Sequence, residues 1–166
     1  MRCYVLMGVS GCGKSSVGTA LQAACNLDFM DGDDLHPKRN IAKMARGIPL
    51  DDDDRAPWLA DVGRALARHE GAIAVGCSAL KKIYRDWIRN EVREPVHFLH
   101  LDAPRHVLEQ RVAHRPGHFM PASLLESQFA TLERLHRDEW GGQIDITRPF
   151  DQVLAQSEGY VRETMI

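Results

Sequence analysis

The 166-residue chain lacks the features that mark membrane-spanning or strongly basic proteins. It has no apolar run near the roughly 18 residues that a membrane-spanning helix needs. Its 21 Lys and Arg against 23 Asp and Glu give a net charge of −2, which excludes nucleic-acid binding through bulk positive charge. The short apolar stretch at the N-terminus runs into a glycine-rich loop instead of a small-residue cleavage site, so it predicts a strand and not a signal peptide. We therefore expect no membrane or nucleic-acid partner and a cytoplasmic location.

Cysteines and aromatic residues are also scarce. The four cysteines are widely spaced and form no C-x-x-C pair, which indicates reduced thiols and not a disulfide framework or a zinc site. His114 and His118 are separated by a Pro-Gly pair that breaks helical register, so we do not expect them to bind a metal. Aromatic residues make up 7% of the chain, and we expect its tryptophans to pack in the core or at an interface.

Apolar runs of strand length alternate with segments of helical periodicity. The expected strands are residues 3–7, 27–30, 72–77, 96–101 and 143–147, and the expected helices are residues 15–24, 57–68, 81–92, 105–112, 121–135 and 150–164. This alternation predicts βαβ units and a parallel sheet covered on both faces. The length suits one domain, residues 1–166, of three-layer α/β/α architecture with a five-stranded, mostly parallel sheet.

The only conspicuous block of like charge is the aspartate run at residues 51–54. Aspartate is favoured at helix N-termini, and proline is favoured in the first helical turn. We therefore expect the run to form a solvated turn that caps a helix starting near Pro57.

A phosphate-binding loop follows the first predicted strand. The stretch GVSGCGKS satisfies the pattern G-x-x-x-x-G-K-[ST] in full. Its glycines let the backbone turn around an anion and present N–H groups, and the helix that follows directs its positive end to the same place. Lys14 is expected to contact the β- and γ-phosphates, and the Ser15 hydroxyl to reach Mg²⁺. The predicted nucleotide-binding residues of this loop are Gly8, Val9, Ser10, Gly11, Cys12, Gly13, Lys14, Ser15 and Ser16.

The kind of nucleotide-binding protein can be narrowed further. The chain has no N-K-x-D guanine motif and is too short for a motor or AAA-type ATPase, which leaves mainly the small-molecule kinases. Asp31, Asp33 and Asp34 follow the second predicted strand. Ligands bind at the carboxyl ends of strands in open α/β sheets. Of Asp31 and Asp33, one can therefore hold Mg²⁺ through water and the other can accept a hydroxyl proton, while Asp34 is expected to bind substrate.

A kinase also needs a lid that excludes water from the reacting phosphate. We place a mobile helical lid at about residues 114–135, where a Pro-Gly pair interrupts a helix. Arg111 and Arg115 lie on its approach, and an arginine that swings onto the γ-phosphate stabilises the charge of the transition state. His118 in the same segment is expected to contact substrate.

Four segments of the chain resemble the gluconate kinases of the thermoresistant type: GVSGCGKSSVG, FMDGDDLHPKRNIAKMARGIPLDDDDRAPWL, CSALKKIYRDWIR and RPGHFMPASLLESQFATLE. The resemblance covers nearly the whole chain. It implies a P-loop kinase fold related to shikimate and adenylate kinases, and a homodimer. It also implies transfer of the γ-phosphate of ATP, with Mg²⁺, to the 6-hydroxyl of D-gluconate. The loop departs from the usual G-S-G-K-S-T at Cys12 and Ser16, and the chain after Leu132 also departs from the family pattern.

The resemblance implies roles for several residues. By similarity to shikimate kinases, Asp33 is the base and Asp31 the carboxylate on the magnesium side. On the same analogy Arg115 is the lid arginine and belongs to the catalytic site. Arg111 packs on adenine and belongs to the nucleotide-binding site. Arg148, just after the last predicted strand, is expected to help form the adenine loop.

Gluconate is an anion with a row of hydroxyls, so its pocket must offer cations and hydrogen-bonding groups. Arg55 follows the aspartate run, and its guanidinium suits a carboxylate in a bidentate way. We expect it to bind substrate, the alternative being that it pairs with the run. Ser78, Lys81 and Arg85 follow the third predicted strand and are expected to face the substrate as well.

Two alternatives remain open at this point. A related kinase that acts on shikimate or another polyol acid has the same composition, and only the DGDDLHP and GHFM segments favour gluconate. A regulatory module that binds nucleotide without an acceptor predicts ATP binding with no turnover stimulated by sugar acids. The aspartates beside the loop and the arginines near the lid argue against this second alternative.

Overall fold

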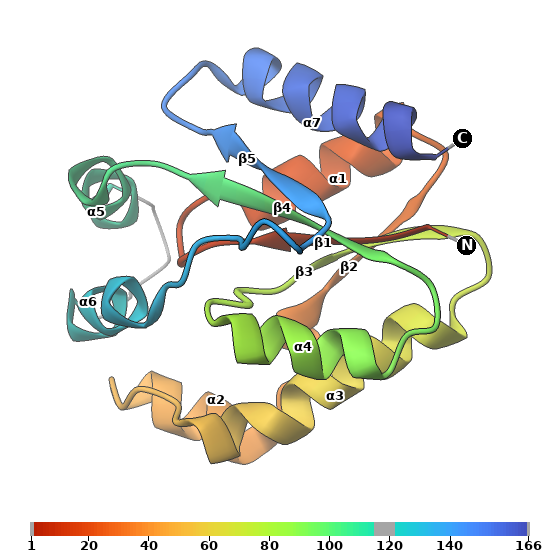
Figure 1. Ribbon diagram of the computed structural model, residues 1–166. Helices are drawn as coiled ribbons and strands as arrows, with labels where there is room; N and C mark the ends of the chain where they lie inside the picture. Colours follow the sequence, from red (N-terminus) through yellow and green to blue (C-terminus); the bar gives the residue numbers. More distant parts are fainter. Residues whose placement is uncertain (1, 115–121, 166) are drawn as a thin grey trace.

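A five-stranded parallel sheet organises the molecule (Figure 1), whose computed structural model describes residues 2–114 and 122–165. Its strands are β1 (Arg2–Met7), β2 (Asp28–Asp31), β3 (Ala72–Gly76), β4 (Val96–Asp102) and β5 (Gly141–Asp145). They lie in the order β2-β3-β1-β4-β5, and every neighbouring pair is parallel. The predicted sheet is confirmed, because all five strands lie within about two residues of their expected positions and no antiparallel pair occurs among them.

Helices cover both faces of this sheet and one of its ends. Figure 1 shows α1 (Lys14–Ala24) and α7 (Phe150–Thr164) on one face, with α3 (Asp52–Arg68) and α4 (Lys82–Asn90) on the other. The short helix α2 (Lys38–Ala45) precedes α3, and a 3₁₀ turn, η1 (Gly32–Leu35), follows β2. The pair α5 (Arg105–Ala113) and α6 (Ala122–Thr131) lies beyond the carboxyl ends of the strands. The three-layer α/β/α architecture is thus confirmed.

The start of α3 differs from the sequence prediction. The Asp51 carboxylate accepts a hydrogen bond from the Asp54 amide at 2.7 Å, and the Asp54 carboxylate accepts one from the Asp51 amide at 3.0 Å. This reciprocal pair is a capping box that satisfies amides at the helix N-terminus. The prediction that the run caps the helix is confirmed, because Asp51 is the N-cap residue. The predicted start near Pro57 is wrong, because residues 52–54 form the first helical turn and Pro57 lies inside the helix.

Two further helices were not placed correctly from the sequence. The structure contains α2, which the sequence analysis did not predict. The helix expected to reach residue 135 ends at Thr131. There the Glu133 amide donates a 2.7 Å hydrogen bond to the Leu80 carbonyl, so the chain leaves the helix to join the turn that follows β3.

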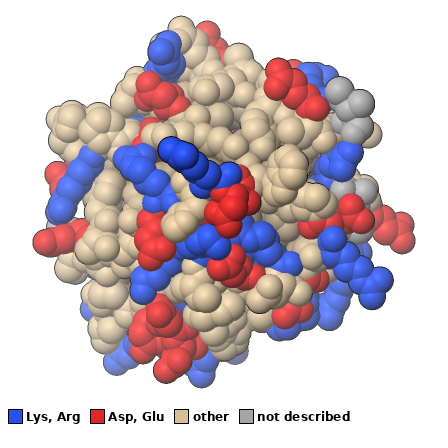
Figure 2. All heavy atoms as spheres, in the orientation of Figure 1, with Lys and Arg blue, Asp and Glu red and all other residues tan. Residues whose placement is uncertain are grey.

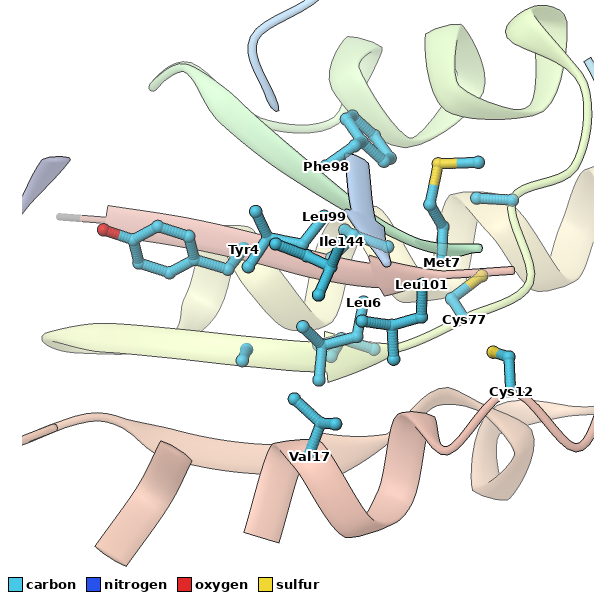
Figure 3. Close-up of a cluster of buried hydrophobic side chains, with 14 of the residues drawn as sticks. Tyr4, Leu6, Met7, Cys12, Val17, Cys77, Phe98, Leu99, Leu101 and Ile144 are labelled. Atoms are coloured by element: carbon cyan, nitrogen blue, oxygen red, sulfur yellow. The ribbon is translucent and has the colours of Figure 1, made fainter. Parts of the chain in front are cut away.

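The core forms around β1 and positions the phosphate loop that follows it. Residues 3–7 are fully buried, and in Figure 3 Val17 of α1 points toward Leu6 of the sheet. Gly18 lets α1 approach β2, because a Cβ at this position would lie 2.1 Å from the ring of Phe29. All four cysteines are free and buried. This packing fixes the N-terminal end of α1 beside the carboxyl ends of β1 and β2.

The surface mixes charges of both signs. On the face in Figure 2, the spheres of Lys and Arg lie among those of Asp and Glu, in keeping with the net charge of −2. In the described part of the chain, no helix combines the length and the apolar character needed to cross a membrane.

Candidate active site

The phosphate loop joins β1 to α1 and depends on glycine. Gly8, Gly11 and Gly13 have φ values of 144°, 83° and 97°, a region that other residues rarely adopt. A Cβ at Gly8 would also lie 2.8 Å from the Leu101 carbonyl oxygen, and one at Gly11 would lie 2.7 Å from Val112 Cγ2. The sequence pattern thus reflects both a required backbone conformation and a close approach by neighbouring elements.

A cavity of about 550 Å³ opens on this loop. Asp33 lines this cavity together with most of the residues predicted to bind nucleotide or metal. These are Ser10, Gly11, Cys12, Gly13, Lys14, Ser15, Ser16, Asp31, Arg111 and Arg148. Apolar side chains complete one part of the wall, namely Val17, Val112, Ile146, Phe150 and Val153. The cavity therefore combines backbone amides and cations with an apolar wall, which suits a ligand with a charged tail and a flat ring.

Lys14 lies within the curve of the loop. Its Nζ donates hydrogen bonds to the carbonyls of Gly8 at 3.0 Å and Val9 at 3.2 Å. These two predicted residues therefore hold the lysine and do not line the cavity themselves. The Nζ atom also lies 3.7 Å from the sulfur of Cys12, which is itself buried. The loop thus holds the Lys14 ammonium group at the wall of the cavity.

Ser15 and Asp31 lie next to each other at the mouth of the loop. The Ser15 hydroxyl donates to Asp31 Oδ2 at 3.3 Å. Hydroxyl and carboxylate oxygens are the ligands that Mg²⁺ prefers, and the ion usually completes its shell with water and phosphate. The donor set present at this edge of the sheet therefore fits a magnesium ion.

Asp33 lies beside this pair on the turn η1. Its amide donates to Asp31 Oδ1 at 3.0 Å, which caps the turn and fixes the two carboxylates relative to each other. Burial of the carboxyl among the pocket walls raises the pKa of Asp33, Lys14 opposes the rise, and Asp31 and Asp34 add to it. The side chain is nevertheless 71% exposed, so water in the pocket limits the size of the pKa shift. The Asp33 carboxylate is thus accessible from the cavity, and its pKa lies above that of an ordinary aspartate.

A histidine that the sequence analysis missed lies behind Asp33. His36 Nε2 is 3.8 Å from Asp33 Oδ1, and the ring stacks on Trp58 with centroids 3.8 Å apart. Burial, with Arg55 as a second cause, lowers the pKa of His36 to about 4, so the ring is neutral at pH 7. Asn40 contacts His36 Nδ1 through its side-chain nitrogen at 3.2 Å. No helical spacing signals this contact in the sequence, because His36 precedes α2 and only Asn40 lies on that helix.

Two predicted substrate residues, Arg55 and Lys81, lie over the same tyrosine ring. The guanidinium carbon of Arg55 is 5.2 Å, and Lys81 Nζ 5.5 Å, from the centroid of Tyr84. Arg55 donates to the Leu50 carbonyl and to the Tyr84 hydroxyl, and Lys81 donates to Asp52 at 3.3 Å. The guanidinium of Arg55 is thus linked to the aspartate run through Tyr84, whose hydroxyl donates to Asp52, so the alternative of pairing with the run stays open. The cluster brings together two cations, and Tyr84 and Asp52 are members that sequence reasoning missed.

Arg85 is a correction to the predicted substrate site. Its side chain is fully buried, and its Nε and Nη2 donate to the two carboxylate oxygens of Glu139 at 2.7 and 2.9 Å. Nη1 donates to the Ala79 carbonyl at 2.9 Å and to the Glu133 carbonyl at 3.2 Å. Its donors are thus engaged within the protein, which gives Arg85 a structural role in place of the predicted contact with substrate.

The remaining predicted residues lie at the edge of the site or outside its description. The Ser78 carbonyl accepts a 3.2 Å hydrogen bond from the Gly8 amide, which ties the turn after β3 to the phosphate loop. Asp34 is exposed on η1. Arg115 and His118, and with them the start of the predicted lid, lie outside the described residues.

Comparisons with known proteins identify the family. The shikimate kinase family model matches residues 10–141. The thermosensitive gluconokinase of Escherichia coli K12 is 45% identical over 157 residues, covering 92% of this chain and 83% of that protein. The thermoresistant gluconokinase of the same organism is 44% identical, covering 93% and 90%. The chain belongs to the gluconokinase family. A solved gluconokinase from Sinorhizobium meliloti 1021 has a TM-score of 0.90 at 44% identity, covering 98% of this chain and 92% of that one.

Family membership confirms the resemblance inferred from the four sequence segments and the P-loop kinase fold. It also identifies the chain as an enzyme of the kinase class. The similarity to the thermosensitive and the thermoresistant relative is nearly equal, so the chain is not assigned to either type.

Proposed function

We propose that this chain transfers the γ-phosphoryl group of ATP to the 6-hydroxyl of D-gluconate, giving 6-phospho-D-gluconate and ADP. The observation that carries the proposal is the 550 Å³ cavity, which residues 10–16 of the phosphate loop line together with Asp31 and Asp33. Gluconokinases that are 44–45% identical over most of the chain support gluconate as the acceptor.

The triphosphate of ATP is expected to lie along the loop. Loop amides and Lys14 would surround the phosphate oxygens, and the N-terminal end of α1 adds the positive end of its dipole. The adenine would occupy the apolar wall near Ile146 and Phe150, flanked by Arg111 and Arg148. Arg111 donates a hydrogen bond to the Ile146 carbonyl, which keeps its guanidinium plane at this wall.

Ser15 would hold Mg²⁺ directly and Asp31 through water. When bound, the ion neutralises charge on the phosphate oxygens. The contact between the Ser15 hydroxyl and Asp31 already places both groups at the same edge of the pocket. Little protein movement is then needed to bring them to a common ligand.

Asp33 would accept the proton of the attacking hydroxyl. In phosphoryl transfer the protein acts chiefly by positioning the groups and stabilising charge. Asp33 is fixed through its amide to Asp31, and the neutral His36 behind it adds no competing positive charge. The raised pKa of Asp33 brings its proton affinity closer to that of a base working near neutral pH.

The carboxylate and hydroxyls of gluconate would bind toward the cluster of Arg55 and Lys81. Tyr84 and Asp52 hold these cations in place, which reduces the side-chain entropy lost when an anion binds. Ser78 and Asp34 are proposed to bind the sugar-acid hydroxyls. The proposal also includes the predicted contacts of Arg115 with the γ-phosphate and of His118 with substrate. It further includes a homodimer and a cytoplasmic location.

The alternative is phosphorylation of shikimate or another polyol acid, and the match to the shikimate kinase family model favours testing it. A coupled assay of ADP release over a panel of sugar acids and shikimate separates the two. We expect the highest kcat/KM with D-gluconate. A higher value with any other acid would replace gluconate in the proposal.

The role of the loop is tested in the same assay with Lys14→Ala. Loss of this charge from the phosphate site should lower turnover by about 10³-fold or more. Lys82→Ala is the matched control, because Lys82 pairs with Asp86 on α4, away from the cavity lining. Turnover near that of the wild type in Lys14→Ala would contradict the proposed phosphate site.

A further inference from the structure

The tip of the phosphate loop is joined to α6 by a reciprocal pair of hydrogen bonds. The Ser10 amide donates to Gln128 Oε1 at 2.7 Å, and Gln128 Nε2 donates to Ser10 Oγ at 3.1 Å. A backbone N–H can only donate, so the orientation of the Gln128 amide is fixed by its partner. The two residues are 118 positions apart in the chain. This contact is thus tertiary and not a local turn.

A second contact reaches the same tip from α5. A Cβ at Gly11 would lie 2.7 Å from Val112 Cγ2, so the Val112 side chain already covers this part of the loop. The two helices also touch each other, since the Arg105 guanidinium lies 5.7 Å from the centroid of Phe129. The tip of the loop is therefore held between α5 and α6, beyond the carboxyl ends of the strands (Figure 1).

The chain that follows the C-terminal end of α6 is anchored independently of the loop. The Glu133 amide donates to the Leu80 carbonyl at 2.7 Å, and the Lys82 amide donates to the Glu133 carboxylate at 3.1 Å. With this end fixed and Leu125 packed in the core, the contact between Gln128 and Ser10 joins α6 directly to the phosphate loop.

We propose that Gln128 is a positioning residue, which docks α6 on Ser10 and so keeps this helix beside the site of phosphoryl transfer. Ser10 lines the nucleotide cavity, so the docked helix borders the end where the phosphates would lie. A helix in this position limits access of water to the γ-phosphate and favours transfer to the acceptor over hydrolysis. The catalytic part of the inference rests on the proposed function, whereas the docking itself does not.

Docking is tested by hydrogen exchange on the protein without nucleotide. Gln128→Ala removes both hydrogen bonds. Each net hydrogen bond changes the equilibrium between the docked and the undocked helix by a factor of a few, so amides at residues 124–131 should exchange on the order of tenfold faster. Glu126→Gln is the matched control, because Glu126 is exposed on the same helix. Unchanged exchange at α6 in Gln128→Ala, relative to wild type and control, overturns the proposal.

Gln128→Glu keeps the bulk of the side chain and tests whether an acceptor for the Ser10 amide is enough to dock α6. The glutamate keeps an acceptor for the Ser10 amide but adds a negative charge beside the phosphates. We expect exchange at α6 to stay within about twofold of the wild type, while the KM for ATP rises several-fold. Exchange in this variant as fast as in Gln128→Ala would overturn the assignment of docking to this hydrogen bond.

The catalytic consequence is measured as ADP formed per phosphorylated gluconate. In Gln128→Ala we expect this ratio to rise several-fold above that of the wild type and of Glu126→Gln, with the phosphorylation kcat falling. Faster exchange with an unchanged ratio would overturn the role in water exclusion. If the chain phosphorylates no sugar acid, the proposed function fails, while the exchange experiment still decides whether Gln128 docks α6.

Discussion

At the residue scale, neighbouring carboxylates in the candidate site have different surroundings. Asp31 accepts hydrogen bonds from the Ser15 hydroxyl and from the Asp33 amide. Asp33 opens to the cavity, and its pKa is raised by burial among the pocket walls and by the carboxylates beside it. Burial and neighbouring negative charges disfavour the charged form of Asp33, whereas Asp31 is held in place by its two hydrogen bonds. The two groups are therefore suited to different tasks, a ligand for a cation and an acceptor for a proton.

This difference predicts the effect of Asp33→Asn. The amide keeps the size of the side chain but cannot accept the hydroxyl proton, so kcat should fall by about 10²-fold or more. The affinity for a non-hydrolysable ATP analogue, measured by calorimetry, should change by less than about threefold, since the loop and Asp31 are intact. Asp53→Asn on the surface of α3 is the control. An unchanged kcat in Asp33→Asn would remove this residue as the base.

The buried pair of Arg85 and Glu139 predicts a pH-dependent stability. Hydrogen bonds from Arg85, the His136 amide and Arg89 outweigh burial and lower the pKa of Glu139 to about 2. Because the folded-state pKa is below the ordinary value of 4.5, the pair stabilises the fold above about pH 4.5 and loses this contribution as pH falls toward 2. Glu139→Gln should lower the free energy of unfolding by about 3 kcal/mol at pH 7.

The measurement for Glu139→Gln is urea unfolding at pH 7, 5 and 3. The gap in free energy of unfolding between wild type and variant should be largest at pH 7 and narrow at pH 3. Glu158→Gln, which affects a surface pair with Arg162, should change stability by less than about 0.5 kcal/mol. A gap that does not change with pH would contradict the proposed ionisation of Glu139.

Residues of the phosphate loop could be predicted because their chemistry and spacing are contained in one short stretch. Arg85 was misplaced because its partner Glu139 lies 54 positions away, and nothing near Arg85 in the sequence indicates that it is buried. Gln128 was missed for the same reason, since its partner Ser10 belongs to the opposite end of the chain. Long-range pairing of polar side chains is what local patterns do not contain.

At the element scale, the capping box predicts how Asp51 contributes to stability. Asp51→Ala removes the acceptor for the Asp54 amide at the start of α3 and should lower the free energy of unfolding by about 1 kcal/mol. Thermal or urea unfolding measures this loss. Asp53→Ala in the same turn is the matched control, and its effect should be limited to a few tenths of a kcal/mol from the helix dipole. Equal losses in both variants would show that net charge, and not the cap, matters.

Strands could be predicted better than helices for a physical reason. The central strands β1 and β4 are buried on both faces, so apolar residues dominate their sequences, although His97 and His100 interrupt the run in β4. In contrast, α2 is eight residues long and buries little except Asn40, while its apolar Ile41 is exposed, so its apolar residues do not mark a face that packs on the core. The end of α6 depends on the contact between Glu133 and Leu80, which is again tertiary. Boundaries set by capping or by distant contacts were thus the ones misjudged.

At the scale of the whole molecule, the strand order explains why the site forms where it does. With β1 between β3 and β4, the phosphate loop emerges in the middle of the sheet, and β2 brings its aspartates to the same edge. Residues from the start, the middle and the end of the chain therefore line one cavity, among them Ser10, Arg111 and Phe150. A ligand that bridges them should stabilise the molecule as a whole and not one segment.

This coupling predicts a thermal shift with nucleotide. A non-hydrolysable ATP analogue with Mg²⁺ at about 100 times its Kd should add about 2.7 kcal/mol to the free energy of unfolding. For a chain of this length, that corresponds to a rise in Tm of roughly 5–10 °C, measurable by calorimetry. Omitting Mg²⁺ should reduce the rise, because Ser15 and Asp31 then have no cation to share with the phosphates. Lys14→Ala should abolish most of it at the same ligand concentration, while Lys82→Ala should retain it. An equal rise in Tm in Lys14→Ala would mean that the nucleotide binds elsewhere. The cavity at the carboxyl ends of the strands would then not be the nucleotide site.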